Sequence, residues 1–198
     1  MTAMKTAYFD CFSGISGDMV LGACIDLGVP ATYIEKTLGG VIPWTFHLDV
    51  RRAERQGIGG SRVEVVVDED RGSRNYEEIK KLVEAGSLSG RVKDVSLAAF
   101  SRLAHVEARI HGCPVAEVHF HEIGGVDAMV DVIGAALGME WHGVEGVVAS
   151  EIPLGKGFVT CAHGVIPVPA PATIALLEGV PVQGTQVTGE LVTPTGAT

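Results

Sequence analysis

The stretch FHLDVRRAERQGIGGSRVEVVV at residues 46–67 decides the fold class. Apolar and polar residues alternate on both sides of Gly57, Gly59 and Gly60, and this pattern predicts a β-hairpin over residues 44–68. Helical patterns on both sides of the hairpin interrupt the regular alternation of strand and helix that a doubly wound sheet requires. The sequence therefore predicts an α+β fold, a mixed sheet with packed helices.

Helical and extended patterns surround the hairpin. Upstream, residues 5–12 indicate a short buried strand, and a helix over 18–27 follows with Ser16 as its expected N-cap. The spacing of Thr32 and Glu35 predicts a capping box at the start of the next helix. Downstream, we expect helices over 74–85, 89–111 and 124–138, strands over 144–152 and 157–161, and a short helix between Pro171 and Gly179. Within 89–111, one apolar stripe contains Val92, Val95, Ala99, Leu103, Val106 and Ile110.

Length and charge limit the function classes. The 198 residues suit one domain, 1–198, with 46% hydrophobic and 20% charged residues. The net charge of −9 argues against nucleic-acid binding and favours a role with cations. With no 18-residue apolar run, no signal peptide and four cysteines that form no CxxC pair, we expect a cytoplasmic protein without a membrane segment. Residues 189–198 are typical of a strand entering a turn, which predicts a truncated or split protein.

The strongest candidate metal site is the segment HFHE at 119–122. In an extended chain His119 and His121 share one face, and two imidazoles there can bind one cation. Glu122 follows them, and Asp127 and Asp131 lie four residues apart on one face of the next helix. Imidazole with carboxylate suits Ni, Zn, Fe or Mn. The alternative is a histidine that caps a turn next to a solvated acidic face.

A glycine turn between a strand and a helix provides a second candidate. Ser13, Gly14 and Gly17 resemble the turns that hold a phosphate on backbone amides. Asp10 and Asp18 at the helix start suit a hydrated divalent cation that bridges to phosphate. The alternative is a tight turn with an acidic residue in the first turn of the helix.

Two further groups carry polar chemistry. Cys161 and His163 stand two residues apart, where the cysteine is typical of a core position and the exposed histidine is the better functional candidate. Lys156 between two glycines could meet a phosphate or a carboxylate. An arginine cluster on the hairpin could hold a polyanionic small molecule, or form a solvated strand face; it comprises Arg51, Arg52, Arg55 and Arg62.

Four motifs resemble one known family over essentially the whole chain. They are FDCFSGISGDM at 9–19, VHFHEIGGVDAMVDVIGA at 118–135, GVIPVPAPATIALLEGVPV at 164–182 and GELVTPTGA at 189–197. In this order they resemble the nickel insertion proteins that mature lactate racemase. Long motifs in a shared order are much more specific than a lone HxH pair.

The resemblance implies a nickel chelatase, or cyclometallase, of the lyase class. Such proteins insert Ni²⁺ into pyridinium bis-thiocarboxylate mononucleotide and make the nickel pincer cofactor, using CTP with Mn²⁺ or Mg²⁺. The implied partners are this mononucleotide and the lactate racemase maturation proteins. Formation of a homo-oligomer is a further possibility. We expect this chain to be the N-terminal metal- and precursor-handling domain of a longer protein, truncated before the CTP-binding part. Whether this domain is active without that part is an open question.

The motifs and the family resemblance together suggest roles for individual residues, which we state as hypotheses. The metal ligands are expected among His119, His121, Glu122, Asp127, Asp10 and Asp18. A proton acceptor for the ring carbon is expected at Glu122 or His163. The cofactor contacts are expected at Ser13, Gly14, Gly17 and Lys156. The competing functions are a non-catalytic nickel carrier, a metal-dependent hydrolase and a structural role in which HFHE only packs.

Overall fold

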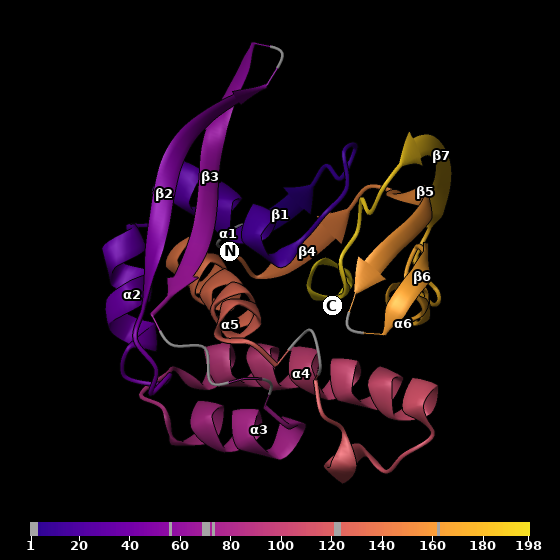
Figure 1. The fold of residues 1–198 in the computed structure, drawn as a ribbon. Helices are drawn as coiled ribbons and strands as arrows, with labels where there is room; N and C mark the ends of the chain where they lie inside the picture. The colour runs from indigo at the N-terminus through magenta and orange to yellow at the C-terminus, as the bar shows by residue number, and fades with distance from the viewer. Residues whose placement is uncertain (1–3, 56, 69–71, 73, 121–123, 162) are drawn as a thin grey trace.

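The computed structural model of the chain describes residues 4–55, 57–68, 72, 74–120, 124–161 and 163–198. In this part of the chain the strands form three small sheets, with helices packed beside them (Figure 1). The α+β class predicted from the hairpin is confirmed. None of the described helices is both long enough and apolar enough to cross a membrane.

The predicted hairpin is present. Strand β2 (Phe46–Arg55) pairs antiparallel with β3 (Ile58–Val67), and Gly57 in the turn has a φ of +80°, which favours glycine. The turn end of the hairpin extends away from the helices (Figure 1). Its other end is fixed, because Leu48 and Val63 are buried in the core.

Two sheets are built from segments that are distant in sequence. Strand β1 (Thr6–Phe9) pairs parallel with β4 (Gly146–Ala149). Strand β5 (Ile152–Cys161) pairs antiparallel with β6 (Gly164–Val168) and parallel with β7 (Val182–Thr188), so this sheet is mixed. Strand β7 was not predicted from the sequence, because its residues are mostly polar and exposed.

Helix α5 (Val126–Trp141) lies at the centre of the core. Its buried positions are Val126, Ala128, Met129, Val130, Asp131, Val132, Ile133, Gly134, Ala136, Leu137 and Gly138. Helix α1 (Gly17–Asp26) packs against it. The approach is close, since a Cβ atom at Gly138 would lie 2.5 Å from Cys24 Sγ. Glycine on α5 therefore sets the spacing of the two helices that carry the candidate acidic residues.

The capping box predicted in the second helix is wrong. Helix α2 (Ala31–Leu38) begins after Pro30, so Thr32 lies inside the first turn and not at the N-cap. Glu35 instead accepts a hydrogen bond from the backbone N–H of Leu48 at 2.7 Å. The carboxylate links α2 to β2, a tertiary contact that local spacing does not reveal.

The next two helices have well-formed N-caps. Helix α3 (Tyr76–Ala85) begins with a capping box in which Asn75 accepts from the Glu78 N–H and Glu78 accepts from the Asn75 N–H. Helix α4 (Gly90–His111) begins at Ser89, whose hydroxyl accepts from a backbone N–H in the first turn. Both starts lie close to the predicted boundaries.

The apolar stripe predicted on α4 is only partly buried. Val95 and Ile110 are 50% and 41% exposed, whereas the buried set is Val92, Ser96, Phe100, Leu103, Ala104, Val106 and Ala108. The helix packs against α3, α5, α6 (Pro171–Leu176) and the 3-10 turn at Val115–Glu117, so its buried arc is set by several neighbours and not by one.

The C-terminal segment ends in a helical turn. Val192 forms a single parallel bridge with Ile15, and α7 (Pro194–Ala197) follows with Thr193 as its N-cap. The predicted strand over 189–198 is therefore limited to that bridge. The segment crosses the start of α1 and forms one wall of the cavity described next.

Candidate functional site

A cavity of about 750 Å³ lies where the starts of α1 and α5 meet the hairpin, the mixed sheet and the C-terminal segment. Its ionisable and thiol side chains are Asp18, Asp127, Asp131, Arg62, Glu64, Glu190 and Cys161. We call this space the acidic cavity. Helix α1 contributes Asp18, and α5 contributes Asp127 and Asp131, one turn apart. The geometry therefore brings together carboxylates more than 100 residues apart in the chain.

Asp131 is the most unusual group in the cavity. Its residue surface is only 9% exposed, and its Oδ1 atom is buried without a hydrogen-bond partner among the described residues. Burial, and then the negative charges of Asp18 and Asp127, raise the pKa of Asp131 from 3.8 to about 7. The carboxyl group is therefore half protonated near neutral pH.

Glycine at position 17 makes room for this carboxyl group. A Cβ atom on Gly17 would lie 2.6 Å from Asp131 Oδ2, so a larger residue would force the two helices apart. The Gly17 N–H donates to Thr195 Oγ1 at 3.3 Å. This predicted cofactor-binding glycine therefore lies against Asp131 and joins α1 to the C-terminal segment, although it is not in the described lining of the acidic cavity.

Asp18 and Asp127 lie in the first turns of their helices and are exposed. Unpaired N–H groups give a helix N-terminus a partial positive charge, which stabilises a carboxylate there. Asp18 Oδ1 also accepts a hydrogen bond from the Ser16 hydroxyl. Both side chains are therefore open to the cavity, where they could contact a cation.

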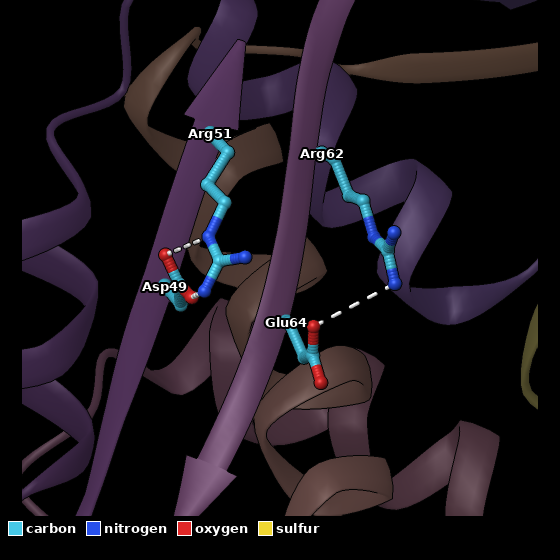
Figure 2. Close-up of polar contacts among 4 residues, drawn as sticks. All are labelled: Asp49, Arg51, Arg62 and Glu64. Carbon is cyan, nitrogen blue, oxygen red and sulfur yellow. Dashed lines mark hydrogen bonds and ion pairs between the residues drawn. The ribbon is translucent and has the colours of Figure 1, made fainter. Parts of the chain in front are cut away.

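The hairpin contributes the positive charge. Arg62 on β3 lines the cavity and lies 3.6 Å from Glu64 in an exposed ion pair (Figure 2). Its cross-strand neighbour Arg51 pairs instead with Asp49, whose hydrogen bond and charge raise the pKa of Arg51 (Figure 2).

The other members of the arginine cluster have different surroundings. Arg52 pairs with Asp26 at 3.1 Å. Arg55 stands at the turn end of the hairpin, opposite Ile58. Within the described lining of the acidic cavity, Arg62 is thus the member that fits the predicted anion contact.

The glycine turn is tied to the C-terminal segment. Gly14 has a φ of +105°, and a Cβ atom there would lie 1.9 Å from the Leu191 carbonyl oxygen. The Gly14 N–H donates to the Cys11 carbonyl and the Ile15 N–H to the Leu191 carbonyl, both at 2.9 Å. These two amides serve internal hydrogen bonds, while the neighbouring Ser13 is exposed.

The remaining predicted site residues lie in other places. Asp10 lines a separate cavity of about 420 Å³ next to Cys11. His119 is exposed and forms an isolated antiparallel β-bridge with Asn75, the residue before α3. Lys156 donates to Gln186 Oε1 at 2.5 Å.

His163 stands opposite a histidine of α4. Its ring centroid is 5.1 Å from that of His111, and His111 Nε2 is 3.4 Å from Glu107 Oε2. His121 and Glu122 lie outside the described residues. Among the residues that are described, no three His, Cys, Asp or Glu side chains are already arranged to hold a metal ion.

Part of this site has no signal in the local sequence. Cys161, interpreted as a core residue, is half-buried and lines the acidic cavity. Glu64 and Glu190 received no role, because no local pattern connects them to the helix starts. Asp131 was predicted to share a helix face with Asp127, and the signal that could have singled it out is a carboxylate within the otherwise apolar run MVDVIGAALG at 129–138.

The sequence profile of the nickel insertion protein family matches residues 7–198. The chain belongs to the nickel insertion protein family. The resemblance predicted from the four motifs is thus confirmed over nearly the full sequence. No solved structure shows significant similarity to the chain.

Curated relatives support the same assignment. A protein of Syntrophobacter fumaroxidans, provisionally named as a nickel insertion protein, is 50% identical over 98% of this chain. Two Desulfitobacterium hafniense proteins, from strains DCB-2 and Y51, are 47% and 46% identical over 98% of it. Both are named pyridinium-3,5-bisthiocarboxylic acid mononucleotide nickel insertion protein. The chain spans about half the length of these relatives, 50% of the first and 48% of the other two.

Proposed function

We propose that this chain binds Ni²⁺ and takes part in its insertion into pyridinium-3,5-bisthiocarboxylic acid mononucleotide. The acidic cavity is the observation that carries the proposal. Its volume of about 750 Å³ lies within the range of small-molecule sites. Its carboxylates attract a cation, and Arg62 supplies a guanidinium group for a phosphate. The nickel ion is the cargo of this reaction and not a resident cofactor.

The complete reaction belongs to proteins about twice this length. We propose for them a CTP-dependent cyclometallation of the lyase class, with Mn²⁺ or Mg²⁺ accompanying CTP. This chain would be the N-terminal part that handles the metal and the precursor. Its proposed partners are the mononucleotide and the lactate racemase maturation proteins, and its proposed compartment is the cytoplasm.

The insertion step requires a proton acceptor. Ni²⁺ displaces one proton from a ring carbon as the nickel–carbon bond forms, and the sulfur atoms of the two thiocarboxylate groups donate electron pairs to the metal. No electron is gained or lost overall. We propose Glu122 or His163 as the base that takes the proton.

The proposed nickel ligands are drawn from His119, His121, Glu122, Asp127, Asp10 and Asp18. Asp18 and Asp127 have the best structural support, since both line the acidic cavity. Imidazole and carboxylate ligands hold Ni²⁺ loosely enough for transfer to a sulfur-rich acceptor. Ser13, Gly14, Gly17 and Lys156 stay proposed contacts of the mononucleotide outside the acidic cavity, whose described lining includes none of them.

Nickel uptake by the purified chain tests the proposal. Elemental analysis and calorimetry would compare the parent chain with a His119→Ala, His121→Ala double variant. His47→Ala, which alters an exposed histidine on β2, is the matched control. We expect the parent and the control to bind Ni²⁺ and the folded double variant to bind it about tenfold or more weakly.

Two results would count against this account. A parent chain that takes up no nickel would contradict nickel binding itself. Equal affinity in the parent and the double variant would remove the histidines from the site. A chain that binds nickel but never the mononucleotide would fit the alternative function, a nickel carrier.

A further inference from the structure

A second cavity, of about 570 Å³, is lined by α4, α5, the β1–β4 sheet and the C-terminal segment. Most of its lining is apolar, and much of it consists of small side chains. Ala98 and Ala99 of α4 and Ala135 and Ala136 of α5 are examples. We call this space the apolar cavity. Its volume and its lining are typical of a site for a small organic molecule.

One buried carboxyl group belongs to both cavities. Asp131 lines the apolar cavity as well as the acidic cavity, and so does Thr195. Asp131 is nine-tenths buried, and its Oδ1 atom has no hydrogen-bond partner among the described residues. An ionised carboxylate in such surroundings is unfavourable unless an opposite charge or a donor compensates it. A bound ligand could supply that partner.

The charges around Asp131 do not supply it. Burial raises the pKa of Asp131 most, and the negative charges of Asp18 and Asp127 raise it further. Arg102 provides a cation in the described lining of the apolar cavity, but its guanidinium group donates to the Leu176 carbonyl. A ligand that complements this cavity therefore combines an apolar surface with a positive charge.

A flat ring with a delocalised positive charge has both properties. Such a cation is more weakly hydrated than a compact ammonium group, so it loses less on entering an apolar site. Phe9 of β1 contributes an aromatic side chain to the lining, and aromatic rings attract cations. Gly17 lines the same cavity beside Asp131, where a Cβ atom would lie 2.6 Å from Oδ2.

We propose that the apolar cavity holds the pyridinium ring of the mononucleotide, with Asp131 as the counter-charge of the ring. This inference rests on the proposed function, from which the mononucleotide is taken. The ring is flat, and it is cationic because its nitrogen is bonded to the ribose. The adjoining acidic cavity, with Arg62 in its lining, is left for the phosphate and the nickel ion. The position of Gly17 in the apolar cavity agrees with its proposed contact to the mononucleotide.

Calorimetric titration with the mononucleotide and Ni²⁺ at about pH 8, where Asp131 is mostly ionised, tests this placement. Asp131→Asn removes the counter-charge. The double variant Ala99→Leu, Ala135→Leu fills the apolar cavity from two helices without changing any charge, and neither alanine lines the acidic cavity. Asp94→Asn, on the exposed face of α4, is the control. We expect the first two variants to bind the mononucleotide about tenfold or more weakly, and the control to match the parent.

Circular dichroism and nickel uptake of every variant complete the experiment. We expect all of them to be folded and to retain nickel uptake. Affinity equal to that of the parent in either cavity variant would overturn the placement of the ring and leave the proposed function standing. Loss of nickel uptake in Asp131→Asn would assign Asp131 to the nickel site and overturn its role as the counter-charge of the ring. A parent chain that binds no mononucleotide would contradict the proposed function, and this inference with it.

Discussion

Replacing Asp131 with asparagine should make the folded chain more stable at alkaline pH than the parent. The pKa of Asp131 is raised from 3.8 to about 7 in the folded state, so the folded chain holds this proton more tightly than the unfolded chain. The free energy of unfolding of the parent therefore falls as pH rises through this window. At 1.36 kcal/mol per pH unit the full loss is about 4 kcal/mol, of which about 3 kcal/mol falls between about pH 5 and about pH 8.

Asp131→Asn removes this loss because the amide does not titrate. Urea unfolding in the presence of EDTA would measure both proteins at the two pH values. We expect the variant to gain up to about 3 kcal/mol relative to the parent on going from the lower to the higher pH. Asp127→Asn, which removes only one repelling charge, should give a smaller gain. An unchanged difference between Asp131→Asn and the parent at both pH values would refute the assignment of a buried, repelled carboxylate.

Three further substitutions test the packing around the cavity by urea unfolding. Gly138→Ala should lower the free energy of unfolding by about 1–2 kcal/mol, because the new methyl group meets Cys24 and outweighs the gain in helix propensity; an increase would contradict the close helix contact. Asn75→Ala should cost about 1 kcal/mol through loss of the capping box, and Thr32→Ala less than half of that; equal losses would argue against the two helix starts. Gly14→Ala should cost about 2 kcal/mol or more, since its φ is positive and the Leu191 carbonyl blocks the new methyl group; a neutral effect would contradict the turn geometry.

Local patterns predicted the features whose causes are local. The alternation around Gly57 specified the hairpin, and the apolar run after Gly125 specified the central helix. The predicted N-cap Ser16 and the predicted helix start at residue 89 agree with the observed helices to within a residue or two. In each case neighbouring residues alone determine the backbone conformation, so the sequence contains the required information.

Features that depend on distant contacts were not predicted. Glu35 has the spacing of a capping box, but its carboxylate bonds to β2. Val95 has helical spacing but is 50% exposed, because several neighbours define the buried arc of α4. Strand β7 lacks an apolar pattern and exists through its pairing with β5.

Some residues of the candidate site were predicted from local motifs, whereas others depend on distant contacts. Asp18 and Asp127 were predicted as ligands from separate motifs, and the fold brings their helix starts to one cavity. Asp10, close to Asp18 in sequence, faces a different cavity because the glycine turn reverses the chain between them. Cys161 and Arg62 reach the acidic cavity only through the placement of the sheet and the hairpin, which no sequence motif specifies.

Binding of the mononucleotide to the chain in the presence of Ni²⁺ tests the central claim most directly. Calorimetric titration would compare the parent with Arg62→Ala, which removes the cavity guanidinium, and with Arg51→Ala, its cross-strand neighbour paired to Asp49 (Figure 2). We predict binding by the parent and by Arg51→Ala, and an affinity about tenfold or more lower for Arg62→Ala. Absence of binding by the parent, or an equal effect of the two substitutions, would contradict the assignment of the acidic cavity as the site of nickel and precursor handling.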